Sequence, residues 1–288
     1  MAVDAVVSVG APRTTVAELV ARLEAGVRGV QDGEGWRAYL AAMSRFHQYA
    51  AGNILLVLAQ KPDATRLAGF HTWLRLGRHV KRGERGIRIL APVTARRQAE
   101  SEDDDEPDAR TVLRWRVVTV FDYSQTEGTD LPPHPCQTLT TDSERGRWLF
   151  ARLLQVARAE GIEVRADIRG LGTAHGAYVP GTRVIALAPG LSDDQRAKTL
   201  AHELGHALLL HGHGDLRREE EEAEAEGVAF VVTAWAGLDT SGYSFGYVAD
   251  WAGRKDGAAL VRRVGATIQK AAAAIIRRLA PEETNESA

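Results

Sequence analysis

The pattern His202-Glu203-x-x-His206 restricts the chemistry of this chain more than any other stretch of its sequence. Residues four apart lie on one face of a helix, so the two imidazoles can reach the same metal ion. Glu203 then lies beside the ion without binding it, where its carboxylate can accept a proton from water. Zinc held by three protein ligands keeps a fourth position for water. The pattern therefore predicts a catalytic zinc site.

The residues around this pattern predict that it lies on a buried helix. The segment Ser192-Asp-Asp-Gln195 has the composition of a capping box with acidic residues in the first turn. Apolar residues follow at helical spacing, namely Ala197, Leu200, Ala201, Leu204 and Leu208. An apolar face of this kind buries the helix and keeps most water away from the metal.

The third metal ligand must lie elsewhere in the chain. Metzincins require a glycine and a histidine at the positions where this chain has Leu209 and Gly212, so that class is excluded. A glutamate-rich segment further on predicts a second helix, on which Glu222 and Glu226 share a face. We expect Glu222 to bind zinc and Glu226 to orient a ligand histidine. Glu224 remains an alternative ligand.

Four other residues near these helices are candidates for accessory roles. His211 and His213 follow the first helix, and either could assist catalysis, although loop histidines without a role are the simpler interpretation. Tyr243 and Tyr247 follow the second helix, where a phenol could reach the oxyanion of a hydrolytic reaction. The predicted catalytic set is therefore Glu203 with Tyr243 and Tyr247.

The two helical motifs resemble those of ImmA/IrrE-type and ArdC-type metallopeptidase domains, which are gluzincin-like. The resemblance rests on the segment His202–His211, with the sequence HELGHALLLH, and on the acidic pattern from Glu222 to Ala229. In those families the first glutamate of the second motif is the third ligand, and the residue four positions later supports the site. The resemblance therefore implies these roles for Glu222 and Glu226, although ImmA/IrrE proteins usually have Asn or Asp where this chain has Glu226.

The remaining composition is that of a cytoplasmic protein. The 288 residues suffice for one large or two ordinary domains. A single cysteine, Cys136, excludes an internal disulfide framework and is compatible with a reducing cytoplasm. Residues 1–10 lack the basic and apolar regions of a signal peptide. Because no apolar run is long enough to span a bilayer, we expect no membrane partner.

Secondary-structure patterns predict an α+β fold with two domains. Residues 1–130 begin with helices and continue with a small antiparallel sheet, interrupted by an acidic, disordered loop at 100–108. A proline-rich linker at 131–141 marks the domain boundary. Residues 142–280 are expected to form the zincin-like, gluzincin-type metallopeptidase domain, and 281–288 a disordered tail.

The first domain contains a strongly basic segment. Residues 36–99 contain twelve lysine and arginine residues against two acidic residues, Asp63 and Glu84. Such a segment attracts a polyanion. Cations that contact phosphates, next to aromatic rings that stack on bases, are typical of proteins that bind single-stranded nucleic acid. A basic surface over a core that contains the aromatic rings would give the same pattern, so the residues alone leave both interpretations open.

The same region resembles the N-terminal single-stranded-DNA-binding (ssDNA-binding) domain of ArdC antirestriction proteins. The resemblance covers about residues 30–130 and rests mainly on Phe46–Leu56, Gly69–Ile87 and Val120–Thr126. One departure is Ala50, where that family commonly has serine. Together, the charge pattern and the resemblance imply ssDNA binding by Tyr49, Asn53, Trp73, Arg75, Arg78, Lys81, Arg82, Arg85 and Arg88.

These patterns lead to one leading hypothesis for function and two alternatives. The leading hypothesis is an ssDNA-binding, zinc-dependent metallopeptidase of antirestriction type, in which Glu203 activates a water molecule at the zinc for peptide hydrolysis. The first alternative is an antirestriction protein that shields DNA by binding it and whose metal is structural. The second is a regulatory protease that cleaves a repressor. The sequence identifies no protein substrate.

Overall fold

The computed structural model describes residues 14–95, 111–131, 142–212, 216–240 and 256–279. The expected acidic loop at 100–108, the linker beyond Leu131 and the tail from 281 lie outside the described residues. Cys136, His213, Tyr243 and Tyr247 also lie outside them.

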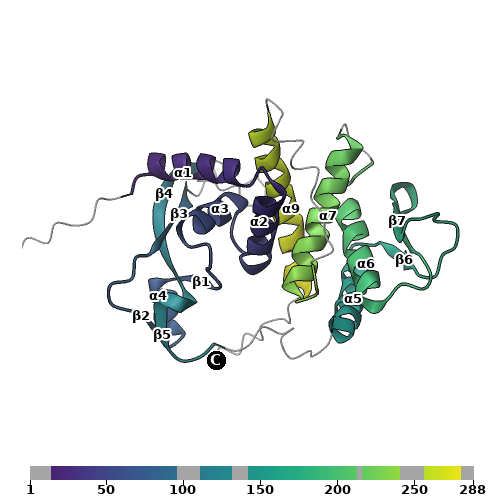
Figure 1. Cartoon of the computed structure of the whole chain (residues 1–288), viewed down its shortest axis with the longest axis horizontal. Helices are drawn as coiled ribbons and strands as arrows, with labels where there is room; N and C mark the ends of the chain where they lie inside the picture. Colours follow the sequence, from purple (N-terminus) through teal and green to yellow (C-terminus); the bar gives the residue numbers. More distant parts are fainter. Residues whose placement is uncertain (1–13, 96–110, 132–141, 213–215, 241–255, 280–288) are drawn as a thin grey trace, which may run out of the picture.

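Four described α-helices, one of them short, and two small sheets form the N-terminal half (Figure 1). The helices are α1 (Val16–Gly29), α2 (Gly33–Arg45), α3 (Ala51–Gln60) and, between two strands, the short α4 (Phe70–Arg75). The strands are β1 (Leu67–Gly69), β2 (Arg78–Val80), β3 (Ile87–Ala95), β4 (Thr111–Asp122) and β5 (Thr126–Gly128), with the short helix η1 (Tyr123–Gln125) before β5. A reciprocal capping box between Thr15 and Glu18 starts α1.

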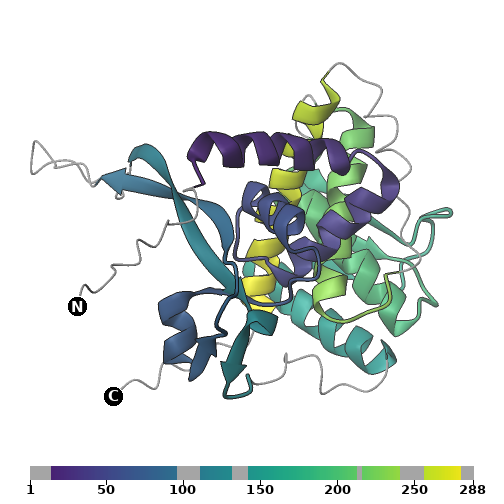
Figure 2. The same cartoon turned by 60° about the vertical axis from the view of Figure 1, so that its left-hand side comes forward.

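The larger sheet is antiparallel, with the order β1–β4–β3. Figure 2 shows β3 and β4 as a long hairpin that extends away from the helices. One face of this sheet is buried through Ile87, Ile89 and Val120. The strand β3 lies at an edge of the sheet, and side chains of α3 cover part of that edge. Asn53 and Gln60 do so by hydrogen bonds to the backbone of β3.

The described part of the C-terminal half contains four long helices beside a third small sheet. The helices are α5 (Asp142–Ala159), α6 (Asp193–Leu208), α7 (Arg218–Trp235) and the last described helix, α9 (Gly257–Leu279). The strands are β6 (Glu163–Arg165), β7 (Gly176–Val179) and β8 (Val184–Leu187), with the short helix η3 (Pro180–Thr182) between β7 and β8. Their order is β6–β8–β7, so β7 is an edge strand, and it packs against α6.

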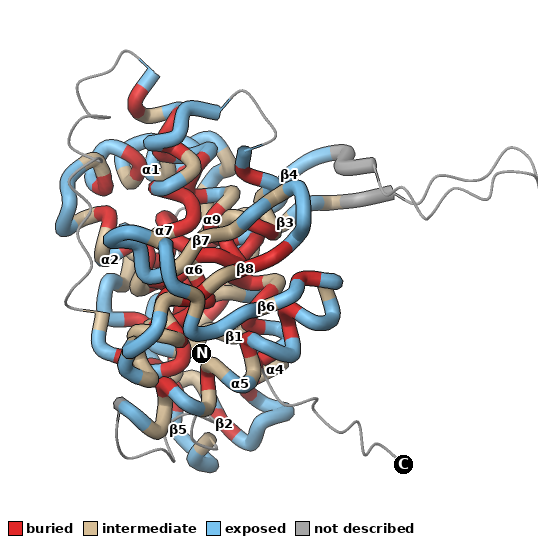
Figure 3. Tube along the Cα trace, turned by 90° about the vertical axis from the view of Figure 1, so that its right-hand side faces the viewer, coloured by how far each residue is buried: buried red, intermediate tan, exposed pale blue. Residues whose placement is uncertain are grey.

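One hydrophobic core runs through both halves. The helix α9 lies between them in Figure 1 and contacts α3 on one side and α7 on the other. Its buried residues include Val264, Ile268 and Ile275. Gln269 of α9 also donates hydrogen bonds to the backbone carbonyls of His47 and Tyr49, at 2.7 and 2.6 Å. Figure 3 shows the buried segments concentrated where the helices meet.

This arrangement of helices with small, mostly antiparallel sheets confirms the α+β class expected from the sequence. None of the described helices is long and apolar enough to cross a membrane.

Candidate metal centre and nucleic-acid interface

The helix α6 carries both histidines of the metal pattern on one face. The hydroxyl of Ser192 accepts a hydrogen bond from the amide of Gln195, as expected for the helix start. The side chain of Gln195 instead donates to Thr199, so only half of the expected capping box forms. The apolar residues of α6 are buried, except Leu208 in its last turn, which is partly buried. His202 and His206 therefore point to the opposite side, with their Nε2 atoms 3.0 Å apart.

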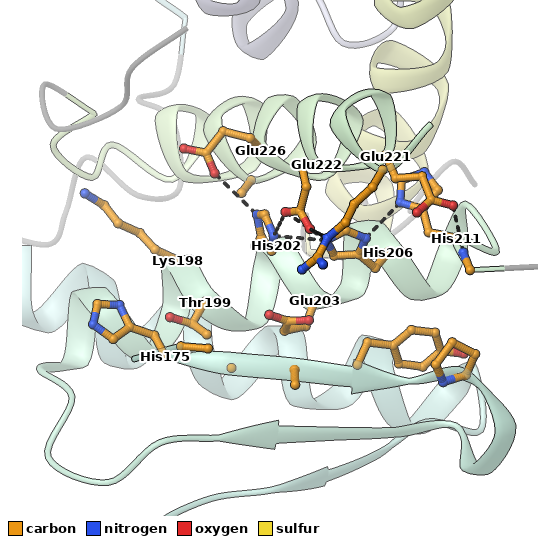
Figure 4. A pocket seen from close by; sticks show the side chains of 18 of the residues that line it. His175, Lys198, Thr199, His202, Glu203, His206, His211, Glu221, Glu222 and Glu226 are labelled. Carbon is orange, nitrogen blue, oxygen red and sulfur yellow. Dashed lines mark hydrogen bonds and ion pairs between the residues drawn. The ribbon is translucent and has the colours of Figure 1, made fainter. Parts of the chain in front are cut away.

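The second helix, α7, packs unusually close to α6 and supplies the third candidate ligand. A Cβ atom at Gly205 would lie only 3.1 Å from the Cα of Ala225, so a larger residue would push the two helices slightly apart. In this packing, Oε2 of Glu222 lies 3.4 Å from Nε2 of His202 and 3.6 Å from Nε2 of His206 (Figure 4).

The separations between these three atoms fit a divalent metal ion. Ligand atoms about 2.1 Å from a tetrahedral ion lie about 3.4 Å from one another. The three observed separations lie around that value, and no large rearrangement is needed to bind an ion. Two imidazole nitrogens and one carboxylate oxygen are also ligands that zinc accepts. In the metal-free site, the neighbouring imidazoles of His202 and His206 hold the pKa of Glu222 far below its ordinary value, so this carboxylate is ionised.

Glu203 points away from the three ligand atoms, toward the strand β7. Its side chain is buried, and a Cβ at Gly176 would lie 3.0 Å from its Oε1 atom. Burial raises the pKa of Glu203 above its ordinary value. The neighbouring histidines and the backbone amide of Tyr178 lower this pKa and so offset part of the increase. A carboxylate in such surroundings is a stronger base than one in water.

The other two candidate glutamates of α7 lie in different places. Oε2 of Glu226 is 3.3 Å from Nδ1 of His202, on the side of the ring away from the candidate ion. Burial alone would lower the pKa of His202, but Glu222 and Glu226 raise it to about 9. Glu224 is 2% exposed and faces His211 instead of the ligand atoms. The geometry therefore favours Glu222 over Glu224 as the third ligand.

A cleft of about 1120 Å³ contains the candidate metal centre. Its walls come from β7, α6 and α7, and they include His175, Tyr178, Lys198 and Arg218, which the sequence did not suggest. Lys198 and Arg218 lie four residues before His202 and Glu222 on the same helices, so helical spacing was the available signal for them. His175 and Tyr178 border the cleft only because β7 packs against α6, which no local spacing predicts. Tyr243 and Tyr247, the expected oxyanion donors, lie outside the described residues.

Two of the expected DNA-binding residues lie inside the N-terminal fold. Trp73 is 1% exposed, and its indole N–H donates to the carbonyl of Phe121 at 2.9 Å. Arg78 is 4% exposed, donates to backbone carbonyls that include Thr126 and Gly128, and lies 3.9 Å from the ring centre of Tyr123. In this conformation neither side chain can reach a nucleic acid.

Two more of the expected residues are engaged within the fold, and the others lie at the surface. The hydroxyl of Tyr49 donates to the carbonyl of Leu67, and Asn53 binds the backbone of Leu90. The remaining candidates are exposed or, in the case of Arg88, partly exposed. They are Arg75, Lys81, Arg82, Arg85 and Arg88.

Two exposed aromatic residues of this half, Phe70 and Trp115, were not in the expected set of DNA-binding residues. Phe70 is 45% exposed, and Trp115 is 52% exposed between the exposed residues Arg114 and Arg116. The alternation Arg114-Trp115-Arg116 within a strand was the available signal, because neighbouring strand residues point to opposite faces.

Comparisons with known protein families found one match in each half of the chain. Residues 12–121 match the model of the N-terminal domain of anti-restriction factor ArdC. Residues 157–234, which include α6 and most of α7, match the IrrE N-terminal-like domain model of the M78 peptidases. An uncharacterized protein of Bacillus anthracis, pXO2-81, is 27% identical over 245 aligned positions, which cover 73% of this chain and 41% of that protein. This chain thus spans about two fifths of the length of that relative.

Two crystal structures of the antirestriction ArdC protein from the R388 plasmid are also similar. Both are 22% identical to this chain with a TM-score of 0.48. The match to the metal-free structure covers 80% of this chain and 85% of the ArdC chain. The match to the Mn(II)-bound structure covers 82% of this chain and 86% of the ArdC chain. The two family matches establish that the chain carries an ArdC-type N-terminal domain followed by an IrrE-like domain of the M78 peptidase family.

Proposed function

We propose that this chain is an ssDNA-binding, zinc-dependent peptidase of antirestriction type. The observation that supports the peptidase most strongly is the position of Glu222 near both His202 and His206, at separations that suit a tetrahedral ion. Glu203 lies next to this group but outside it. A purely structural zinc site is normally closed by a fourth protein ligand. Here the side chain of Glu222 is 48% exposed and borders an open cleft, which supports catalysis.

In this proposal three residues bind the metal, and a fourth transfers the proton. His202, His206 and Glu222 hold zinc, which when bound makes a water molecule more acidic and polarises a carbonyl group. Glu203 accepts the proton of the attacking water and delivers it to the amine that leaves. The buried position of Glu203 suits both steps, because its raised pKa lies closer to neutral than that of an exposed glutamate.

The strand β7 is the proposed docking site for the peptide. It is an edge strand of its sheet within the described residues, and it forms one wall of the cleft. An extended peptide can add to such an edge by backbone hydrogen bonds. A peptide held there would lie beside Glu203, which faces β7.

The partly exposed face of the β1–β4–β3 sheet is the proposed platform for ssDNA. Cross-strand pairs Arg88–Thr119 and Pro92–Trp115 lie on this face, opposite the buried face. Phe121 belongs to it as well, and Phe70 packs against Phe121 with ring centres 6.5 Å apart. Six residues of strand separate Trp115 from Phe121, which corresponds to about 20 Å.

Such a face combines the two features that ssDNA requires. Phe70 and Trp115 offer exposed rings on which bases can stack. Arg88 lies between these rings, and Arg82 and Arg85 are exposed in the turn that leads into β3. These cations provide attraction for phosphates.

The variant Glu203→Gln tests the proposed function. An amide cannot accept the proton, but it preserves the shape of the side chain. We expect zinc content and ssDNA affinity to stay at the wild-type level, while hydrolysis falls about 10²–10⁴-fold. The assays are cleavage of proteins bound to ssDNA and protection of incoming DNA against restriction. Equal protection by wild type and Glu203→Gln would show that DNA shielding, and not proteolysis, causes any antirestriction effect.

A further inference from the structure

A chain of side chains, two of them buried, continues from His206 away from the candidate metal position. It runs through His211 and Glu224 to Arg263 on α9. We propose that His211 and Glu224 are positioning residues that fix the ring of His206 for metal binding, and that Arg263 anchors the outer end of this chain. This inference rests on the proposed metal site and adds a second layer of residues behind it.

The backbone after α6 brings His211 back to the helix. Leu210 has a φ of 56°, in the left-handed region, and the amide of His211 donates to the carbonyl of His206 at 3.0 Å. The amide of Leu210 donates to the carbonyl of Ala207, which completes a Schellman motif. Glycine usually occupies the left-handed position, so leucine there is strained. The sharp turn places the buried imidazole of His211 against that of His206.

When His206 binds a metal, only one assignment of protons to the rings of His206 and His211 gives every N–H group an acceptor. His206 must keep Nε2 unprotonated to bind a metal, so its Nδ1 carries the proton. That proton is donated to Nδ1 of His211, 2.9 Å away. His211 then carries its own proton on Nε2 and donates it to Oε2 of Glu224 at 3.2 Å. Each donor thus meets an acceptor, and His206 is held in the tautomer that a metal requires.

Glu224 can end this chain because its charge is balanced. An ionised carboxylate that is almost fully buried is costly unless it is paired. Its second oxygen, Oε1, accepts a hydrogen bond from Nη1 of Arg263 at 3.3 Å. Arg263 also forms an ion pair with Glu220, one turn earlier on α7. A helix distant in sequence thus supports the carboxylate behind the metal ligand.

The test measures the zinc affinity of the full-length chain by competition with a chelator. The variants are Glu224→Gln, which keeps the size of the side chain, and His211→Phe, which removes both ring nitrogens. We expect each to weaken zinc binding about 10–100-fold, as is typical for outer partners of metal ligands. Glu219→Gln, an exposed glutamate on the same helix, is the matched control and should bind zinc like wild type.

Two further readouts separate positioning from general stability. The metal-free melting temperature reports the fold alone, and the visible spectrum of the Co²⁺-substituted protein reports the ligand geometry. A changed spectrum with weaker zinc binding in Glu224→Gln supports the inference, even if His211→Phe does not fold. Wild-type zinc affinity and spectrum in Glu224→Gln would overturn it and leave the proposed peptidase intact. Absence of zinc binding by the wild type would overturn both.

Discussion

The side-chain amide of Asn53 forms two hydrogen bonds with the backbone of Leu90, donating to its carbonyl at 2.8 Å and accepting from its amide at 3.0 Å. Asn53 therefore takes the place of a neighbouring strand along the edge of β3. We expect Asn53→Ala to lower the free energy of unfolding by about 1–3 kcal/mol, because two partly buried backbone groups lose their partners. Urea unfolding would measure this change. Reduced ssDNA affinity at unchanged stability would instead show that Asn53 contacts DNA.

Removal of two exposed cations should weaken the salt dependence of ssDNA binding. Arg82 and Arg85 are both exposed. For single strands, the slope of log affinity against log salt is about −0.7 for each neutralised phosphate. The double variant Arg82→Ala/Arg85→Ala should therefore flatten that slope by about 1.4. Fluorescence anisotropy over a salt series measures it.

A double change on α1 controls for total charge. Arg22 and Arg28 are also exposed, and Arg22→Ala/Arg28→Ala removes the same two charges elsewhere. An equal change of slope in both double variants would count against a local DNA site around the turn before β3.

Trp115→Ala should weaken ssDNA binding by about 1–3 kcal/mol, the usual contribution of one base stacked on an aromatic ring. Because Trp115 is more than half exposed, the melting temperature should hardly change. Trp73→Ala should have the opposite profile, since its buried ring supports the fold and loss of such a ring costs about 3–5 kcal/mol of stability. Anisotropy and thermal unfolding of both variants decide between these roles. Full DNA affinity in Trp115→Ala would remove this tryptophan from the platform.

The carboxylate of Asp122 should make stability depend on pH. Burial alone would raise its pKa, but hydrogen bonds from Ser124 and from the amides of Thr65 and Arg66 hold it below the ordinary value of 3.8. A group whose pKa is lower in the folded chain stabilises that chain above its ordinary pKa. The contribution disappears as the pH falls through the folded-state pKa.

The comparison of wild type with Asp122→Asn isolates this contribution. The difference in unfolding free energy should be largest above pH 3.8 and should shrink as the pH falls below that value. Urea unfolding at several pH values gives the curve. A difference that stays constant over the whole series would mean that Asp122 acts through shape and not through its charge.

The candidate metal centre could be predicted from the sequence largely because it depends on local spacing. His202 and His206 need only one turn of helix, and that periodicity is visible in the chain. The position of Glu222 required the resemblance to known families as well. The role of His211 could not be predicted, because its position depends on a turn in which Leu210 adopts the left-handed conformation. Glycine usually occupies such a position, so a leucine there gives no indication of the turn.

The proposed nucleic-acid interface was harder to predict, because residue type does not reveal the direction of a side chain. Trp73 and Arg78 have the character of DNA-binding residues, yet both are inside the fold. Trp115 has the same character and is exposed. The difference comes from the pairing of β3 with β4 and from the packing of α4, which are contacts between distant parts of the chain.

The position of α9 between the two halves has a consequence for biosynthesis. Ribosomes release a chain from its N-terminus, so α1 to α7 emerge before the helix that packs against both α3 and α7. Until Gln269 and Arg263 are released, the carbonyls of His47 and Tyr49 and the carboxylate of Glu224 lack these partners. Both halves of the molecule therefore reach their final packing only after α9 has left the ribosome.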